Sequence, residues 1–274
     1  GGALFGAGMM IADGCSSRSI VKFSQGDANA LVTLLFIAIF AFASTKGILF
    51  GVVNGFINNQ FMIDISSNLS NFTLNIYFVL AILVLLLAYF VKKVKRVFSL
   101  YDGVIIGFLV GLSWFISGYI GAESIEKEIQ VQALSYVYPS AKTLEFFTFF
   151  EITELSIGVC IVLGAIFGAY FSTFFNKKYS FGCTSKMNFN KLKYNMIGGS
   201  MMGIGGIMAI GCTVGQGLSG VSTLVFSSFL AIISIGVSGF VTGKILYKKD
   251  KLPMCFLFEW EDDDKKQKPL DYEI

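Results

Sequence analysis

The chain has 274 residues, of which 54% are hydrophobic and only 14% are charged, and its mean hydropathy is +0.70. Soluble globular domains carry about a quarter charged residues, so this composition is that of a membrane protein. The chain contains no histidine, which excludes Ser-His-Asp hydrolysis, histidine-ligated haem and most catalytic zinc sites. The formal charge of +3 is too small to indicate a nucleic-acid partner.

Long apolar runs predict an all-α protein that crosses the membrane several times. A run of about 20 apolar residues is needed to span the hydrocarbon core of a bilayer. Runs of that length cover residues 29–53, 72–91, 101–121, 146–175 and 221–247. We therefore expect one transmembrane domain over residues 1–250, followed by a charged cytoplasmic tail over residues 251–274.

The distribution of lysine predicts the orientation, because basic loops stay on the cytoplasmic side. Lysines follow the runs 72–91, 146–175 and 221–247. The connection 54–71 has no Lys or Arg, and the connection 122–143 carries three glutamates, so both are expected outside. The expected location is a bacterial inner membrane, with the C-terminus in the cytoplasm.

Two Gly-rich segments, each too short for a comfortable span, form an internal repeat. GGALFGAGMMIADGC at residues 1–15 aligns with GGSMMGIGGIMAIGC at residues 198–212, and seven of the fifteen positions are identical. A polar segment and then a long apolar run follow each copy, so the repeat copies extend over residues 1–53 and 196–247. The predicted orientation makes the two copies antiparallel. This pattern is typical of an inverted repeat whose broken half-helices meet near the membrane midplane.

Each break ends in Gly-Cys and should leave free backbone N–H groups at the start of the next half-helix. Such N-termini attract anions, through the N–H donors and through the helix dipole. A cysteine thiol is a soft, weak donor and acceptor that suits a polarisable sulfur anion. The candidate substrate-binding and relay residues are Cys15, Cys212, Ser16, Ser17, Arg18, Thr213 and Gln216, and the candidate backbone and packing glycines are Gly14, Gly211, Gly215 and Gly217.

Simpler interpretations stand beside these. The glycines could serve helix packing alone, and Arg18 could be an ordinary positive-inside anchor. Each cysteine could be a small buried hydrophobe, and this interpretation is favoured for Cys160, which lies among Ile and Val. No role is assigned to Cys183 or Cys255, and no metal site or cofactor is expected.

The two repeat segments resemble a known family. GGALFGAGMMIADGCSSRSIVKFSQGDANALVTLLFIAIFAFASTKG and GGSMMGIGGIMAIGCTVGQGLSGVSTL are similar to the two characteristic segments of the YeeE/YedE family of sulfur-compound transporters. The resemblance implies an hourglass-shaped inner-membrane protein that takes up thiosulfate and passes it along cysteines through S–H···S hydrogen bonds. The family's motif cysteines correspond to Cys15 and Cys212. The family also has an earlier segment with a third cysteine, so we expect this chain to lack its N-terminal part.

The expected function is therefore that of a permease for thiosulfate or a related sulfur-containing anion, and not that of an enzyme. A cytoplasmic sulfur-carrier protein is a possible partner. The alternatives are a membrane thiol–disulfide redox protein, which the absence of a C-x-x-C motif disfavours, and a carrier of a selenium or persulfide compound. No Walker motif is present, and the acidic residues that could couple transport to an ion gradient include Asp13 and Glu145.

Overall fold

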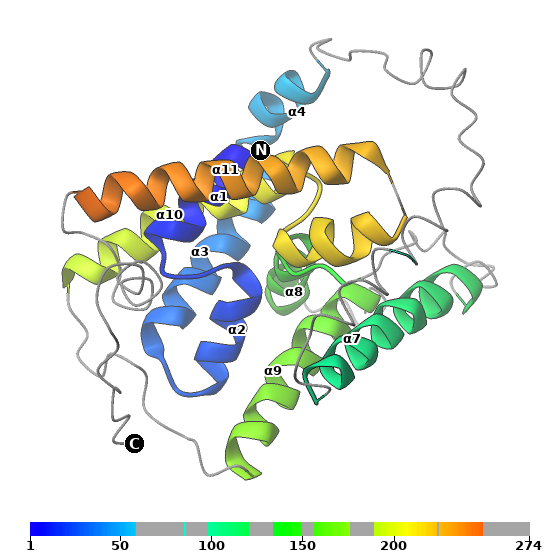
Figure 1. Cartoon of the computed structure of the whole chain (residues 1–274). Coiled ribbons are helices and arrows are strands. Elements are labelled where there is room, and N and C mark those ends of the chain that lie inside the picture. Colours follow the sequence, from blue (N-terminus) through cyan, green and yellow to red (C-terminus); the bar gives the residue numbers. More distant parts are fainter. Residues whose placement is uncertain are drawn as a thin grey trace.

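The computed structural model of the chain describes residues 1–58, 85, 98–120, 134–149, 156–175, 189–223 and 225–248. All regular elements within these ranges are helices (Figure 1). They are α1 (Gly2–Ile11), α2 (Ser16–Ser24), α3 (Ala28–Thr45), α4 (Phe50–Asn58), α7 (Phe98–Phe115), the π-helix η1 (Ile116–Ile120), α8 (Val137–Phe149), α9 (Ile157–Phe175), α10 (Phe189–Met208), the π-helix η3 (Gly215–Gly220) and α11 (Phe226–Lys248). The expectation of an all-helical protein is confirmed for this part of the chain.

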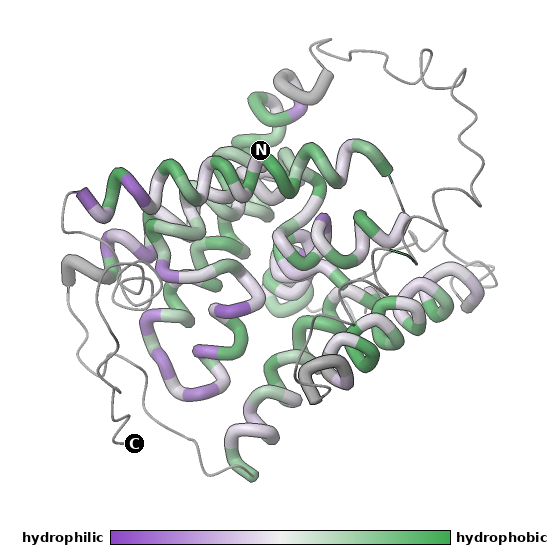
Figure 2. Tube along the Cα trace, viewed as in Figure 1, coloured by the Kyte–Doolittle hydropathy of each residue, from purple (hydrophilic) through white to green (hydrophobic). Residues whose placement is uncertain are grey.

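Three of the described helices, α3, α9 and α11, are long and apolar enough to cross a membrane. A shorter apolar stretch covers Gly103–Tyr119. Large apolar side chains lie exposed along α9 and α11, as expected for surfaces that face lipid. Figure 2 shows these long helices as predominantly apolar, and polar residues gather on α2 and its connections. Apart from residue 85, the predicted span 72–91 lies outside the described residues, as do Cys183, Cys255 and the tail 251–274.

Two predicted spans are not continuous helices. The run 29–53 is interrupted because α3 ends at Thr45 and α4 begins at Phe50. Gly47 lies at this interruption, where a Cβ atom would come 2.7 Å from the Cα of Ala43, so a larger residue would collide with the preceding turn. Within the run 146–175, Ser156 is not helical and α9 begins directly after it, at Ile157.

Two further expectations were wrong. Residues 137–143, which the charge pattern placed in an external loop, belong to α8, and Val137 and Ala141 are buried in the core. A proline is tolerated in the first turn of a helix, so Pro139 at the third position of α8 does not prevent it from forming. Cys160 is exposed on α9 and is not a buried hydrophobe. Its position in an apolar helix does not reveal which face of that helix packs inward.

Glycine faces hold α1 and α10 in close contact. A Cβ atom on Gly8 would lie 2.7 Å from the carbonyl oxygen of Gly198, and a Cβ atom on Gly205 would lie 2.8 Å from that of Gly1. Residue numbers rise along α1 as they fall along α10, so the two helices run in opposite directions. The contacts are also reciprocal, because adding 197 to Gly8 and Gly1 gives Gly205 and Gly198.

The same reciprocity extends to the long helices that cover this pair. Figure 1 shows α11 lying across α1, and α3 packs against α10. A Cβ atom on Gly6 of α1 would lie 2.3 Å from the carbonyl oxygen of Ile235 in α11. A Cβ atom on Gly203 of α10 would lie 2.8 Å from that of Ile37 in α3. Both α1 and α10 therefore pack, through glycine, on the long helix that follows the other copy.

Candidate functional site

The first break lies between α1 and α2. The N–H of Gly14 donates to the carbonyl oxygen of Met9 at 3.0 Å, a bond from the sixth residue back to the first that is typical of a helix C-terminus. Asp13 has a φ of 61° and Gly14 a φ of 151°, so the chain turns away from the helix axis here. Cys15 then occupies the N-cap of α2 in an extended conformation.

The second break repeats this geometry 197 residues later. The N–H of Gly211 donates to the carbonyl oxygen of Gly206 at 2.8 Å, and Ile210 has a φ of 55°. Helical structure resumes directly after Cys212, with η3 inside it. The carbonyl oxygen of Cys212 accepts from the N–H of Gln216 at 2.8 Å, as that of Cys15 accepts from Ser19 at 3.0 Å. Both predicted Gly-Cys positions are thus helix breaks of one design.

Long polar side chains fold back over both breaks. The Arg18 stem covers Gly14, where a Cβ atom would come 3.1 Å from Cδ of Arg18. Gln216 covers Gly211 in the same way, at 3.2 Å from its Cγ. The amide of Gln216 also donates to the carbonyl oxygen of Ala209 at 2.6 Å. That bond satisfies one of the carbonyl groups that the end of α10 would leave without a partner.

The two thiols have different surroundings. Cys15 is partly exposed, and its Sγ lies 3.1 Å from Oγ of Ser17. Cys212 is fully buried, and its Sγ accepts a hydrogen bond from the N–H of Gly215 at 3.3 Å. Both are free thiols. Each thiol thus contacts the first turn of the half-helix that follows it.

The other predicted residues lie around these thiols with differing exposure. Ser16 is fully buried beside Cys15, and its hydroxyl has no hydrogen-bond partner among the described residues. Thr213 is half-buried, whereas the Arg18 side chain is exposed. Gly215 contacts Ser135, but nothing lies within 4 Å of a Cβ atom placed on Gly217. Packing therefore does not require glycine at position 217.

Sequence reasoning missed two residues that precede α8. Oγ of Ser135 lies 3.0 Å from a Cβ atom placed on Gly215. Tyr136 is partly buried and packs against the core cluster that contains Cys212. No repeat or periodicity marks this segment. The only signal was the proline three residues after Tyr136, which is compatible with a helix start.

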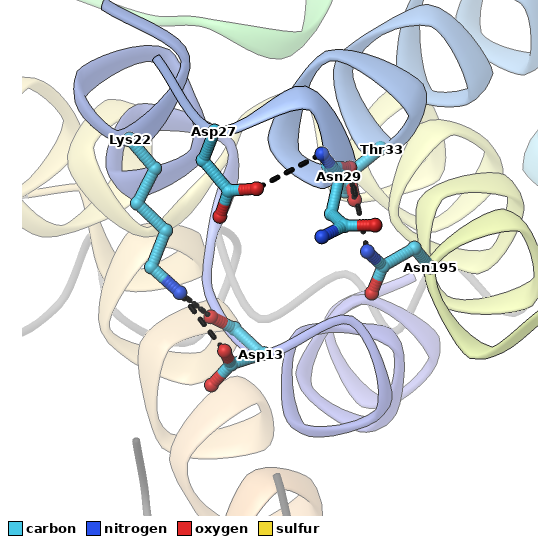
Figure 3. Close-up of polar contacts among 6 residues, drawn as sticks. All are labelled: Asp13, Lys22, Asp27, Asn29, Thr33 and Asn195. Carbon is cyan, nitrogen blue, oxygen red and sulfur yellow. Dashed lines mark hydrogen bonds and ion pairs between the residues drawn. The ribbon is translucent and has the colours of Figure 1, made fainter. Parts of the chain in front are cut away.

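A polar ion pair stabilises the first break on the side of α2. Nζ of Lys22 lies 2.9 Å from both the carbonyl oxygen and Oδ2 of Asp13 (Figure 3). Both side chains are mostly buried, with exposed fractions of 18% for Lys22 and 22% for Asp13. Figure 3 also shows Asp27 accepting from the N–H of Asn29 at the start of α3, and Asn195 donating to the Asn29 carbonyl oxygen. The Lys22 bonds join α2 to the connection that precedes it, and the Asn195 bond joins α10 to the start of α3.

A cavity of about 910 Å³ opens beside the second break. None of the described residues that line it is charged. Its polar lining consists of hydroxyl and amide side chains together with backbone, and it includes Ser135, Gln216, Ser219, Thr223, Ser227, Ser228 and Ser234. Such a lining offers neutral hydrogen-bond donors without a fixed charge.

A smaller cavity of about 270 Å³ shares Thr45, Tyr138 and Ile207 with the larger one. Lys46 and Lys142, which both pair with Glu145, lie in its wall. Partial burial would raise the pKa of Glu145, but the hydrogen bonds from the two lysines outweigh it and hold that pKa below its ordinary value. The carboxylate therefore stays charged at neutral pH and neutralises part of the lysine charge.

Within the described residues, no three His, Cys, Asp or Glu side chains lie where they could hold a metal ion. The chain is 20% identical over 260 residues to the thiosulfate transporter TsuA of Escherichia coli (strain K12), an alignment that covers 85% of this chain and 69% of that protein. Residues 1–241 match the family model described as sulphur transport. That match spans most of the chain, both breaks included, and the chain therefore belongs to the sulphur transport (YeeE/YedE) family.

Proposed function

We propose that this protein is a multi-pass membrane permease for thiosulfate or a related sulfur-containing anion. The observation that carries the proposal is the duplicated break, in which a free cysteine stands before the first turn of a half-helix twice, with the same backbone hydrogen bonds. Membership of a sulphur transport family and the similarity to a thiosulfate transporter support the same conclusion.

The two copies form an inverted repeat whose half-helices meet near the membrane midplane. The antiparallel course of α1 and α10 and the reciprocal glycine contacts support this arrangement. Backbone that is not helical is tolerated at that depth only where it faces protein or lines a cavity. Transporters place their binding sites at such breaks. Residues 1–250 accordingly form one transmembrane domain.

Helix N-termini and neutral donors would hold the anion at each break. The first-turn N–H groups of α2 lie directly after Cys15, and the buried hydroxyl of Ser16 has no hydrogen-bond partner among the described residues. Around the second break, Thr213 and Gln216 supply the polar groups. Neutral donors bind an anion without the tight ion pair that would retain it, and the anion can therefore move from Cys212 to Cys15.

The cavity beside Cys212 would be the outer approach, and the first break would be the inner exit. Gly215, which donates to the Cys212 sulfur, and Gln216 line this cavity. At the first break, Arg18 and Lys22 are the nearby cations on α2, as expected for a cytoplasmic side. The protein then lies in a bacterial inner membrane with its C-terminus inside, where a sulfur-carrier protein would receive the product.

Growth on thiosulfate as the only sulfur source tests the proposal. Cells that lack their own uptake system should grow when they express the full-length protein, and should fail with Cys15→Ala and Cys212→Ala combined. Cys160→Ala is the matched control, because this cysteine is exposed on α9. Growth of the double variant at the wild-type rate would exclude the relay role of the two cysteines.

The redox alternative makes a different prediction in the same cells. In a thiol–disulfide protein, Cys15 and Cys212 would form a disulfide in oxidised membranes. Their peptides would then be alkylated only after reduction, which mass spectrometry detects as a mass shift. Because Cys212 is buried, the alkylation is done on the unfolded protein, and the permease proposal predicts that both thiols then alkylate without prior reduction. Uptake of labelled selenite by the same cells would favour the selenium alternative.

A further inference from the structure

The wall of the smaller cavity holds a cluster of three charged side chains that belong to neither break. Nζ of Lys142 lies 2.9 Å from Oε2 of Glu145, and Nζ of Lys46 pairs with Oε1 of the same carboxylate. Lys142 and Glu145 are neighbours on α8, whereas Lys46 caps the C-terminus of α3, 99 residues away from Glu145 in the chain. The cluster therefore depends on the packing of α3 against α8.

One carboxylate bridges two ammonium groups in this cluster, with one oxygen on each. The two lysines are thus spaced for an anion that presents two oxygens bound to one central atom. Such charge-assisted hydrogen bonds are among the stronger ones in proteins. A sulfur atom that carries two terminal oxygens has the same form as the carboxylate, so Glu145 occupies the position that a small oxyanion would take.

The charge and the exposure of the cluster favour an anion that comes from solution. Among the described residues that line the smaller cavity, Lys46, Lys142 and Glu145 are the only charged ones, so positive charge is in excess. A cleft lined with one sign of charge raises the local concentration of the opposite ion. The side chain of Lys46 is 55% exposed, whereas those of Lys142 and Glu145 are 25% and 15% exposed. An anion can therefore reach Lys46 first and the other two from there.

The smaller cavity adjoins the larger cavity beside the second break. The two share Thr45, Tyr138 and Ile207 in their walls, and Gly215 and Gln216 line the larger one. In the predicted orientation α3 runs outward, so its C-terminal end and Lys46 lie on the external side. An anion that leaves the two lysines would therefore pass into a space lined by neutral donors, on the side from which uptake begins.

We propose that Lys46 and Lys142 form an entry site for small oxyanions, thiosulfate among them, and that Glu145 is its built-in competitor. The carboxylate bridges the lysines while the site is empty, yields to the incoming anion and then displaces it toward the larger cavity. The role as an entry site rests on the proposed transport function, whereas the affinity for oxyanions rests on the lysine pair alone. No covalent bond forms or breaks.

The competitor explains how two lysines can attract a dianion without retaining it. Two ammonium groups without a carboxylate would hold a dianion and slow its release. Glu145 lies three residues after Lys142 on α8, so its side chain can restore both ion pairs once the anion moves on. Removing the lysines and removing the carboxylate should therefore have opposite effects on affinity.

The first test measures uptake of labelled thiosulfate by the full-length protein in which Lys46→Met and Lys142→Met are combined. Its KM should rise about tenfold or more while its maximal rate changes little, because the lysines concentrate the anion. High salt should reduce this difference, since it screens the charges. Lys193→Met combined with Lys244→Met is the matched control and should keep the wild-type KM. It also removes two positive charges, but these lysines are exposed on α10 and α11 and line neither cavity.

The second test removes the competitor. Glu145→Gln should lower both the KM and the maximal rate, because the anion binds more tightly and is no longer displaced. A raised KM in this variant would mean that Glu145 only positions the lysines, and would overturn its role as competitor. Should the double lysine variant fail to accumulate in the membrane, Lys46→Met alone, which changes a mostly exposed side chain, should raise the KM to a smaller extent.

Binding is measured apart from transport in the variant that combines Cys15→Ala and Cys212→Ala. Sodium thiosulfate and sodium sulfate should both raise its unfolding temperature in detergent, relative to sodium chloride at equal ionic strength. Adding Lys46→Met and Lys142→Met should abolish that rise. A lysine pair that binds lipid headgroups instead would give a rise with an anionic phospholipid and none with thiosulfate, which would overturn the entry site.

The outcomes separate this inference from the proposed function. A wild-type protein that takes up no thiosulfate, yet is stabilised by it through the two lysines, overturns the proposed function and supports the oxyanion site. A wild-type protein that transports thiosulfate, with the KM at low salt and the stabilisation by thiosulfate both unchanged in the double lysine variant, overturns the entry site alone.

Discussion

The two helix breaks share a backbone but differ in charge. At the first, Asp13 occupies the position of positive φ, and Lys22 pairs with it. At the second, the corresponding residue is Ile210, whose side chain is 85% exposed, and the polar group that folds back is the neutral Gln216. The carboxylate at the first break is therefore not needed to form the turn. The backbone features that both breaks share form the turn, whereas the charged side chains are found at the first break alone.

The glycine contacts are shared by both halves, so the largest expected effect comes from breaking them. Gly6→Ala places a Cβ atom 2.3 Å from the carbonyl oxygen of Ile235, and Gly203→Ala places one 2.8 Å from that of Ile37. Neither neighbour can move without separating two helices, so each change should destabilise the fold by about 1–3 kcal/mol or more. Thermal unfolding in detergent measures the loss.

Gly236→Ala in α11 is the control, because nothing lies within 4 Å of its Cβ position. This variant should unfold at the wild-type temperature or slightly above it. Gly6→Ala and Gly203→Ala that both unfold like Gly236→Ala would contradict the close reciprocal packing.

The Asp13–Lys22 pair distinguishes the first break, and removing one partner should cost more than removing both. Lys22→Met leaves a mostly buried carboxylate without its cation and should destabilise by about 1–3 kcal/mol. Asp13→Asn combined with Lys22→Met should recover most of that loss. A double-mutant cycle on thermal unfolding measures the coupling. Additive effects of the two changes would show that the pair contributes nothing beyond its separate residues.

Ile210 offers the opposite experiment at the second break. A β-branched residue at positive φ is strained, at a cost of about 1 kcal/mol, whereas glycine adopts this conformation freely. Ile210→Gly should therefore raise the unfolding temperature slightly. The equivalent Asp13→Gly should lower it, since that change also removes the partner of Lys22. A destabilised Ile210→Gly would mean that the exposed side chain has contacts of its own.

The smallest expected effect concerns pH. The pKa of Glu145 is held below its ordinary value of 4.5, so its pairs with Lys46 and Lys142 stabilise the fold above that pH. This stabilisation is lost as the pH falls through the lower pKa of the folded state. Glu145→Gln should therefore reduce the difference in unfolding temperature between pH 7 and pH 3. An unchanged difference would mean that these surface pairs contribute nothing.

The sequence predicted the breaks because repeated glycines and cysteines have a local physical cause. A glycine three positions after the helix end and a cysteine directly after that glycine can be read from spacing alone, and both copies have the same pattern. The helical class and the spans corresponding to α3, α9 and α11 followed from apolar length. The interruption after Thr45 and the non-helical Ser156 before α9 were missed, because hydropathy averages over a few residues.

The start of α8 could not be predicted, because it depends on tertiary contacts. Ser135 and Tyr136 come from a segment that carries acidic residues and no repeat, and nothing local places them beside Cys212. The exposure of Cys160 could not be predicted either, since an apolar helix does not reveal which of its sides faces the core. The sequence showed a charge difference between the breaks at Arg18. It did not show that Asp13 pairs with Lys22.

Transport of labelled thiosulfate into proteoliposomes that contain the full-length protein would show whether the two cysteine sites carry the anion. The wild-type protein and the Cys160→Ala control should accumulate label at equal rates. Cys15→Ala and Cys212→Ala should each reduce that rate at least about tenfold, as expected when a contact to the moving anion is removed from either half. A double cysteine variant that transports at the wild-type rate, in vesicles with equal amounts of protein, would exclude both cysteines from the transport path.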